Sequence, residues 1–330
     1  MCPLCASLKL ASSGYSRISR ALITICVASY LKDSSSCSRG DFAAGYAQAM
    51  PVSWSLITVA YNGASVLQRC WSDPRPADVE WIVVDNNSSD GSVAAARALG
   101  ATVIESPSNL GFSAANNIGL AAAKGAYVVF VNPDVTVNYN DLPGLAARID
   151  DVGGLVSPQL INEDRTLQPN GRGMPLLLHK VLNRTSSRDR LRGSYLLFAD
   201  AEDEKYVFWL IGAVVAARID TFEAMGGWNE KFFLYYEDKD ISIRAWRAGY
   251  PVVLLGGFRW VHGWARETTK FKLKPWIREI SSLTRFYSLY PEFLMGGKLA
   301  RRRNPEASAR AGTLFSRGAQ KNDHSESLVG

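Results

Sequence analysis

Between residues 53 and 160 the chain alternates short, continuous apolar runs with alanine-rich stretches. The runs are SLITVAY (55–61), EWIVVD (80–85), ATVIES (101–106), GAYVVFVNPD (125–134) and GGLVSPQLI (153–161). Because their apolar residues are continuous rather than alternating, they predict strands covered on both faces, as in a parallel sheet. The stretches SVAAARALG and SAANNIGLAAAKG predict helices that end at Gly100 and Gly125. This alternation, with short loops, predicts a doubly wound α/β fold.

Polar residues stand at the points where three of these predicted strands end. Asn62 follows the first run, Asp85 ends the second, and an Asn-Pro-Asp triplet (132–134) ends the fourth. In open parallel sheets, ligands bind outside the carboxyl ends of the strands. The sequence therefore predicts a ligand site at this edge, with the carboxylate of Asp134 in it.

One candidate ligand is a dinucleotide, because Asp85 has the position of a carboxylate that would bind a ribose. The turn after the first strand, YNGASVL, has a single glycine, however, and the chain has no G-x-x-x-x-G-K-[ST] motif. Without a glycine-rich loop the backbone cannot closely approach a pyrophosphate. A divalent cation held by Asp134 is the alternative means of neutralising a diphosphate.

Six segments, taken in order, resemble those of the family 2 glycosyltransferases, which are inverting enzymes with the GT-A fold. They are TVAYNG, EWIVVDNNSSDGS, NLGFSAANNIGLAAAKG, VNPD, WLIGAVVAARIDTFEAMGGWNEKFFLYYEDKDISIRAWRAGY and VHGW. NPD in place of D-x-D, together with FFLYYED, is similar to the rhamnosyltransferase-like branch. The resemblance implies a Rossmann-like, mostly parallel sheet with helices on both faces and a C-terminal helical extension. The chain departs from the family at Asn229, in GGWNE where the family has GGFDE.

The resemblance also implies roles for individual residues. The donor, a nucleotide-diphosphate sugar, would be bound by Ala60, Tyr61, Asp85, Asn116, Asn132 and Asp134. Asp134 and His262 would ligate Mg²⁺ or Mn²⁺, and Asp238 would be the general base that deprotonates the acceptor hydroxyl. The acceptor would be contacted, or the site supported, by Trp209, Gly212, Glu237 and Arg244.

Several of these residues also have a purely structural interpretation, which the sequence leaves open. Asp85 could cap a turn, since DNNSSDG is rich in turn formers, and Asp134 could cap a short helix. His262, in FRWVHGW, could be a hydrogen-bonded core histidine. Trp209 could be buried for packing alone.

The run YYEDKD places three carboxylates at the start of a predicted helix, roughly residues 237–248. The positive end of a helix favours the ionised form that a base requires. Arg244 follows Asp240 by one helical turn and is predicted to pair with it. That pairing would leave Asp238 free to act as the base.

Composition adds information mainly about the late, basic part of the chain. Of 330 residues, 47% are hydrophobic and 21% charged, as in an ordinary soluble globular protein, and the net charge of +6 is mild. The segment KFKLKPWIREISSLTRFYSLY mixes cations with apolar residues, including Phe271, Leu273, Trp276, Ile277 and Phe286. It predicts either an interfacial helix on an anionic membrane surface or a helix packed on the catalytic domain. Nucleic acid is not an expected partner.

The chain is predicted to have four parts. They are an atypical extension (1–50), a GT-A domain (51–266), a basic aromatic helical extension (267–303) and a disordered tail (304–330). The run ALITICVASYL (21–31) is too short to span a bilayer; it fits a signal or transit segment, or precedes a natural start at Met50. Cys2 and Cys5 lack a second pair at zinc-ligand spacing, which argues against a metal site there. No apolar stretch predicts a transmembrane helix.

The expected function is therefore a metal-dependent, inverting transfer of a sugar to a lipid-linked or polysaccharide acceptor. The rhamnosyltransferase-like segments favour L-rhamnose from dTDP-rhamnose, and the expected location is the cytoplasmic face of a membrane. Two alternatives stay open at this point. One is a non-catalytic homologue that binds nucleotide sugars, and the other, disfavoured by the missing glycines, is a nicotinamide-dependent oxidoreductase.

Overall fold

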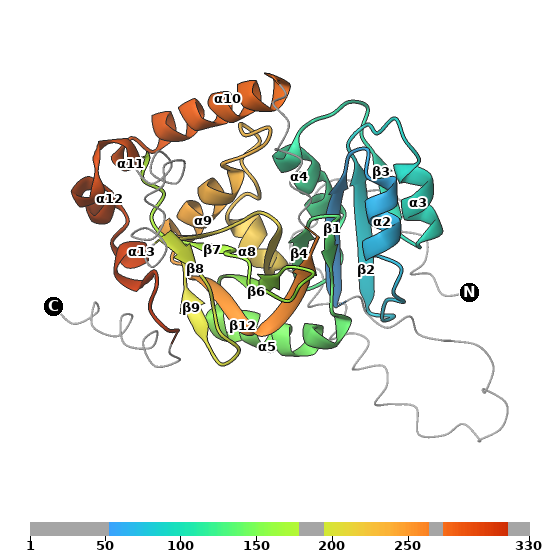
Figure 1. Ribbon diagram of the computed structural model, residues 1–330, viewed down its shortest axis with the longest axis horizontal. Coiled ribbons are helices and arrows are strands. Elements are labelled where there is room, and N and C mark those ends of the chain that lie inside the picture. Colours follow the sequence, from blue (N-terminus) through green and yellow to red (C-terminus); the bar gives the residue numbers. More distant parts are fainter. Residues whose placement is uncertain (1–52, 178–194, 264–272, 316–330) are drawn as a thin grey trace, which may run out of the picture. The chain divides into compact units, whose positions relative to one another are not determined.

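A mixed β-sheet forms the centre of the fold. The computed structural model describes residues 53–177, 195–263 and 273–315, which belong to one compact unit, Met50–Gly330. Within these residues the main sheet has nine strands in the order β3-β2-β1-β4-β11-β6-β12-β5, with β9 paired to β12 (Figure 1).

Four parallel strands form the first half of the sheet, as the apolar runs predict. They are β1 (Trp54–Ala60), β2 (Val79–Asp85), β3 (Thr102–Glu105) and β4 (Tyr127–Val131). β1 pairs in parallel with both β2 and β4. Ala60, Asp85 and the residues after Val131 therefore reach the same edge of the sheet.

Helices cover both faces of this parallel half (Figure 1). They are α2 (Ala64–Cys70), α3 (Ser92–Ala98) and α4 (Phe112–Ala122). On one face, Gly119 of α4 lies so close to Ile57 that an added Cβ would be 2.3 Å from the isoleucine side chain. On the other face, Trp71 at the end of α2 stacks on Trp81, with ring centroids 4.3 Å apart, and Trp81 donates to Thr58. The predicted coverage of both faces is confirmed.

The second half of the sheet is mixed rather than parallel. Its strands are β5 (Val135–Thr136), β6 (Leu155–Ile161), β9 (Glu204–Tyr206), β11 (Val214–Arg218) and β12 (Val252–His262). β11 lies between β4 and β6 and is antiparallel to both, whereas β6 and β12 are parallel to each other. The predicted strand at 153–161 thus exists, but it does not lie beside β4.

Shorter elements build the surroundings of the site. They are a 3-10 turn η2 (Tyr139–Asp141), α5 (Leu142–Val152), β7 (Gly171–Arg172), β8 (Leu196–Leu197), β10 (Trp209–Leu210), α8 (Ile219–Ala224) and α9 (Glu237–Arg247). β10, β7 and β8 form a second, three-stranded sheet, with β7 in the middle. α9 packs against β10, which brings the acidic start of α9 close to this small sheet.

Among the described residues, four helices follow β12. They are α10 (Leu273–Leu289), α11 (Glu292–Met295), α12 (Gly297–Arg303) and α13 (Pro305–Arg310). Phe286, predicted to belong to an interfacial face, is instead fully buried and contacts Tyr236 and Phe293. Ile277 of the same helix is exposed. Of the two alternatives that the sequence left open for this helix, packing on the domain is therefore the one that Phe286 and Tyr287 follow.

The prediction of a disordered tail from residue 304 is wrong for residues 304–315. α13 forms there, and the N–H of Phe315 donates to the carbonyl of Glu204 at 2.7 Å. The Phe315 ring lies 5.3 Å from the Tyr206 ring. A polar segment is ordered here because it adds to β9, which lies far away in sequence. The predicted extension at 1–50 and the tail at 316–330 lie outside the described residues.

No helix among the described residues is both long and apolar enough to cross a membrane.

Candidate active site

The loops after β1 and β2 are joined by hydrogen bonds at the edge of the sheet where the parallel strands end. The N–H of Asn62 donates to Ser88 Oγ at 2.9 Å, and the N–H of Ser89 donates to Asn62 Oδ1 at 2.8 Å. Asn62 and Asn87 have φ values of 53° and 64°, a left-handed conformation that asparagine tolerates well. These bonds pre-form one wall of a cleft of ≈ 430 Å³.

Three of the six predicted donor residues line this cleft, whereas Ala60, Asp85 and Asn116 are not among its lining residues. Tyr61, Asn132 and Asp134 line it, and Tyr61 is exposed enough to stack on a flat ring. Ala60 is buried behind them, and its carbonyl accepts from the N–H of Asn86 at 2.8 Å.

Asp85 is buried at the end of β2 with half of its carboxylate unused. Oδ2 accepts from the N–H of Ser88 at 2.9 Å, so the side chain does cap the turn. Oδ1 is buried and has no hydrogen-bond partner among the described residues. A buried carboxylate oxygen without a partner is costly, and a donor group on a ligand would satisfy it. Asp85 therefore fits both the capping and the binding interpretation.

Asn116 is not among the residues that line the cleft. It is buried in α4, and its Nδ2 has no hydrogen-bond partner within the described part of the chain. Its predicted role in donor binding stays a prediction.

Asp134 and His262 come together because two short strands pair. β5 begins at Val135, and its antiparallel pairing with the end of β12 places Val135 opposite His262. His262 Nε2 lies 3.4 Å from Asp134 Oδ1. The predicted metal-ligand pair, far apart in sequence, is thus adjacent at the edge of the cleft.

Gln168 determines which nitrogen of His262 faces Asp134. Gln168 Nε2 donates to the carbonyl of His262 at 2.9 Å and to Asn162 Oδ1 at 2.7 Å, so its Oε1 must point to His262 Nδ1, 2.8 Å away. Oε1 can only accept, which assigns the proton of a neutral imidazole to Nδ1. The lone pair of Nε2 then points towards the carboxylate of Asp134.

These residues fit a divalent cation. A lone pair and a carboxylate oxygen that face each other at 3.4 Å repel, and a cation between them would relieve the repulsion. Within the described ranges, no group of three or more His, Cys, Asp or Glu residues could hold a metal ion. The remaining ligands would therefore come from a diphosphate and water, as is usual for Mg²⁺ at phosphate sites.

A second pocket, of ≈ 330 Å³, adjoins the first. Phe112, Asn132 and Leu234 line both, so the two spaces meet at Asn132, two residues before Asp134. His262 and Glu237 also line the second pocket. It thus connects the metal-ligand pair to the acidic start of α9.

The chain enters α9 through two strained residues. Tyr235 and Tyr236 have φ values of 70° and 72°, in the left-handed region that large side chains rarely adopt. Such strain persists where the surroundings over-determine it, often at functional sites. Here the buried Tyr236 ring packs on Phe286 of α10. The strained turn places Glu237 and Asp238 in the first turn of α9.

Glu237 and Asp238 have different surroundings. Burial, and then the charge of Asp238, raises the pKa of Glu237 to about 8, so Glu237 holds a proton at neutral pH. Its Oε2 is buried without a partner among the described residues. Asp238 Oδ1 accepts from the N–H of Lys239 at 2.8 Å and lies 3.8 Å from Lys239 Nζ. A carboxyl group that is already protonated cannot accept a proton, so the pair favours Asp238 as base.

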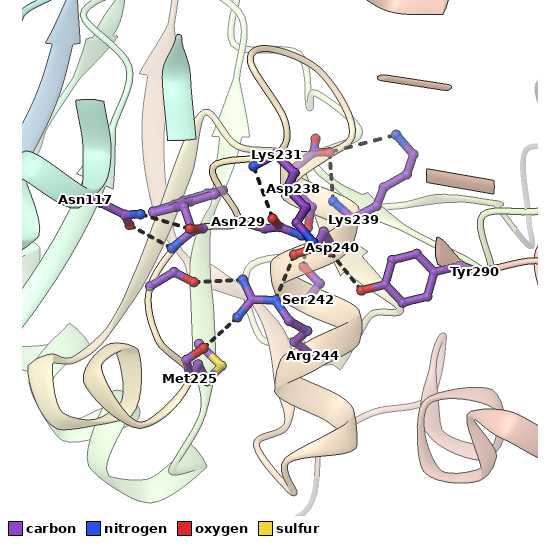
Figure 2. A network of polar contacts seen from close by, with 12 residues as sticks. Asn117, Met225, Asn229, Lys231, Asp238, Lys239, Asp240, Ser242, Arg244 and Tyr290 are labelled. Atoms are coloured by element: carbon purple, nitrogen blue, oxygen red, sulfur yellow. Dashed lines mark hydrogen bonds and ion pairs between the residues drawn. The ribbon is translucent and has the colours of Figure 1, made fainter. Parts of the chain in front are cut away.

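The third carboxylate, Asp240, is the centre of a structural network (Figure 2). Arg244 Nε donates to Asp240 Oδ2 at 2.7 Å, which confirms the predicted pairing. Asp240 Oδ1 accepts from Tyr290 Oη at 2.8 Å and from Asn229 Nδ2 at 3.1 Å. The Arg244 guanidinium also binds the carbonyl of Met225. Arg244 therefore supports the loop before α9.

The network explains why the chain has Asn229 where the family has an acid. The amide of Asn229 donates to a buried carboxylate, whereas an aspartate there would place two negative charges together. Asn229 also accepts from the N–H of Lys231 at 3.2 Å. Its role is to hold this loop against α9.

Trp209 and Gly212, predicted to contact the acceptor or support the site, both lie beside the first turn of α9. Trp209 is buried, with Lys239 Nζ 4.0 Å from its ring centroid, and its indole N–H has no hydrogen-bond partner in the described ranges. Gly212 lines the second pocket, and a Cβ added to it would be 3.6 Å from the Cβ of Asp238. Trp209 thus supports Lys239, while Gly212 leaves room beside the predicted base.

Sequence reasoning missed several residues of the two pockets. Gln168 and Arg172 line the second pocket, and Arg278 of α10 lines the first. The segment LQPNGR, similar to the rhamnosyltransferase-like branch, contains the first two and was the available signal. Arg278 gave no signal because its segment predicts a surface helix.

Comparisons with known proteins match the chain to glycosyltransferases. Two family models match the chain: "Glycosyl transferase family 2" over residues 55–204 and "Glycosyl transferase family group 2" over residues 183–290. An N-acetylglucosaminyl-diphospho-decaprenol L-rhamnosyltransferase of Mycobacterium tuberculosis is 27% identical over 237 residues, which cover 64% of this chain and 76% of that protein. Rhamnosyltransferase WbbL of Escherichia coli is 21% identical over 187 residues, covering 53% of this chain and 69% of its own.

Solved structures share the fold. GalNAc-T7 with UDP, GalNAc and Mn²⁺ superposes with a TM-score of 0.51 at 17% identity, over 80% of this chain and 55% of that one. This chain therefore spans about half the length of that protein. The mannosyltransferase PcManGT of Pyrobaculum calidifontis, with GDP-Man and Mn²⁺, gives 0.50 at 18% identity, over 88% and 80% of the two chains. At these identities the likeness shows the fold, which is GT-A.

The two family models together contain the strand-end residues, the small sheet and the acidic start of α9. The oxidoreductase alternative finds no support in this match. The chain belongs to the family 2 glycosyltransferases and is a glycosyltransferase similar to the rhamnosyltransferases of that family.

Proposed function

We propose that this glycosyltransferase is a metal-dependent, inverting hexosyltransferase of cell-envelope glycan synthesis that moves L-rhamnose from dTDP-rhamnose to a lipid-linked or polysaccharide acceptor. The observation that carries the proposal is the adjacency of Asp134 and His262 where the two pockets meet. The names of the two rhamnosyltransferase relatives support the choice of sugar. The acceptor in the name of the mycobacterial relative, N-acetylglucosaminyl-diphospho-decaprenol, supports a lipid-linked diphosphate as the acceptor.

The first pocket is the proposed donor site. Asp85 would accept a hydrogen bond from the nucleobase through its unused Oδ1, and Tyr61 would cover the base. Asn132, between the two pockets, has a position suited to the ribose or the diphosphate. Arg69 and Arg278, which line the same cleft, add positive charge on the diphosphate side.

Asp134 and His262 would hold Mg²⁺ or Mn²⁺, with Gln168 keeping the imidazole in the ligating tautomer. The bound ion would stabilise the negative charge that develops on the departing nucleoside diphosphate.

The second pocket is the proposed acceptor site. Asp238 would take the proton from the acceptor hydroxyl as that oxygen attacks the anomeric carbon. The diphosphate leaves on the opposite side towards Asp134, so that the anomeric configuration is inverted. Gly212 keeps the approach to Asp238 open.

The proposed place of action is the cytoplasmic surface of a membrane. On α11, Leu294 and Met295 are exposed, and Met295 is exposed by 78%. Lys298, Arg301 and Arg302 follow on α12. Apolar side chains next to cations suit an anionic lipid surface. Compared with the sequence prediction, the proposed contact moves from the aromatic residues of α10 to α11 and α12.

The test is a transfer assay with a panel of nucleotide sugars and a short-chain prenyl-diphosphate N-acetylglucosamine, with Mn²⁺ or with EDTA. The expected result is transfer from dTDP-rhamnose that EDTA abolishes, with the product anomer opposite to that of the donor. Transfer that persists in EDTA would contradict the metal site. Transfer of a different sugar would refute the donor assignment alone.

A further inference from the structure

Arg172 is a cation in the acceptor pocket that the proposed mechanism does not use. It lies in β7, the middle strand of the small sheet, opposite Trp209 on one side and Leu196 on the other. Its side chain lines the second pocket. Of the residues that line this pocket in the described part of the chain, Arg172 alone has a fixed positive charge.

The guanidinium of Arg172 is poorly compensated. Its Nη1 donates to the neighbouring carbonyl of Gly171 at 3.0 Å, and within the described ranges it makes no other hydrogen bond and no ion pair within 4.0 Å. Its centre lies 5.7 Å from the centroid of the Trp209 ring. Burial lowers the pKa of Arg172, yet an arginine stays charged in a protein. Arg172 is only partly buried, so its guanidinium faces the pocket without a paired carboxylate among the described residues and is available to bind an anion there.

The position of Arg172 separates it from the donor diphosphate. The donor cleft has its own positive groups, and Arg172 is not among its lining residues. Arg172 instead shares a pocket with Glu237, next to the proposed base, and lies within the electrostatic reach of Asp238. If a hydroxyl of the acceptor sugar faces Asp238, the group that joins this sugar to its lipid would also lie in this pocket.

We propose that Arg172 binds a phosphate oxygen of the diphosphate that joins the acceptor sugar to its lipid. This inference rests on the proposed function and names the acceptor class, a sugar diphospholipid rather than a neutral glycan. The guanidinium fork can give two parallel N–H···O bonds to a phosphate.

The alternative is that Arg172 binds no phosphate and only balances the negative charge of the carboxylates at the start of α9. In that case removal of its charge would impair every acceptor equally, and no anion would bind in the absence of a metal. If Arg172 serves as an anion site, its replacement by an apolar side chain removes one hydrogen bond to the carbonyl of Gly171 and leaves no carboxylate of the described residues without its ion-pair partner. Arg172→Met is then expected to keep the thermal stability of the unliganded protein.

The first measurement is calorimetric binding of inorganic pyrophosphate in EDTA, which disables the metal-dependent donor site. The native chain is expected to bind it, Arg172→Met to bind about 10- to 100-fold more weakly, and Arg172→Lys to be intermediate. Asp134→Asn is the matched control and should bind pyrophosphate like the native chain. For dTDP with Mn²⁺ the pattern should reverse, with Asp134→Asn impaired and Arg172→Met retained.

The second measurement compares kcat/KM for prenyl-diphosphate-linked and alkyl-linked N-acetylglucosamine. Arg172→Met should lose about 10-fold or more on the diphosphate-linked acceptor relative to the alkyl-linked one. Equal losses on both acceptors, or no pyrophosphate binding by the native chain in EDTA, would overturn the inference. Loss of dTDP binding in Arg172→Met would also overturn it, in favour of a donor site. If the native chain transfers to neither acceptor, the proposed function fails while the binding measurement still decides the role of Arg172. If Arg172→Met does not fold, the same two measurements are made on Arg172→Lys, which is expected to show a smaller loss in the same direction.

Discussion

Replacing Glu237 by Gln should make the protein more stable at alkaline pH, although Glu237 lies in the proposed active site. The structure raises the pKa of this carboxyl from 4.5 to about 8, first through burial and then through the charge of Asp238. Between these two pH values the unfolded chain has lost the proton, whereas the folded chain still holds it. The folded state therefore binds more protons, and its stability falls as pH rises through this window.

The magnitude follows from the size of the shift. Each pKa unit is worth about 1.4 kcal/mol, so a shift from 4.5 to about 8 corresponds to about 5 kcal/mol in full. Integrated between pH 5 and pH 8, the Glu237 contribution is about 3–4 kcal/mol. Glu237→Gln keeps the shape of the side chain and a hydrogen-bond donor but cannot ionise. The variant should thus resemble the native chain at pH 5 and exceed its free energy of unfolding by about 3–4 kcal/mol at pH 8.

The assay is urea unfolding, followed by tryptophan fluorescence at pH 5, 6.5 and 8 without ligands. The exposed Glu306 on α13 provides a matched control, because Glu306→Gln removes a carboxyl that the fold does not bury. The control should follow the native pH dependence. If Glu237→Gln and the native chain lose equal stability between pH 5 and 8, then Glu237 ionises normally. The argument that selects Asp238 as the base would then fail.

Three further predictions concern the metal pair, the base and the loop before α9. Gln168→Ala should weaken Mn²⁺ binding about 10- to 100-fold by freeing the imidazole of His262, measured by the Mn²⁺ dependence of dTDP binding; unchanged Mn²⁺ dependence would refute the tautomer argument. Asp238→Asn should lower kcat by about 100- to 10,000-fold and spare donor binding by calorimetry; full turnover would exclude this residue as base. Asn229→Asp should lower the free energy of unfolding, measured in urea, by about 1–3 kcal/mol, because it replaces a hydrogen-bond donor to Asp240 with a like charge. Asn229→Ala removes only the donor and should lower it by less. A larger loss for Asn229→Ala than for Asn229→Asp would contradict the network.

The α/β architecture could be predicted because strong local patterns specify it. Continuous apolar runs bounded by turn formers coincide with β1, β2, β4 and β6 to within one or two residues at most ends. The strand-end position of Asp85 follows directly from that pattern. The antiparallel insertion of β11 could not be predicted, because an apolar run has no direction and no neighbour in sequence.

The C-terminal helices show the same limit. A mixture of aromatic and basic residues predicts an amphipathic helix equally well on a membrane or on a protein surface. The structure resolves the choice for Phe286, which contacts Tyr236 from the strained turn before α9. For residues 304–315, polar composition concealed an ordered segment that pairs with β9.

The sequence by itself determined the fold class, the strand-end aspartates, the acidic start of α9 and the pairing of Arg244 with Asp240, since each depends on residues close together in the chain. Only the tertiary structure decided that His262 meets Asp134, that Gln168 selects the tautomer of His262, and that Arg172 lines the second pocket. These contacts join segments far apart in the chain, and their geometry depends on sheet register, in which a shift of one residue turns a side chain to the opposite face.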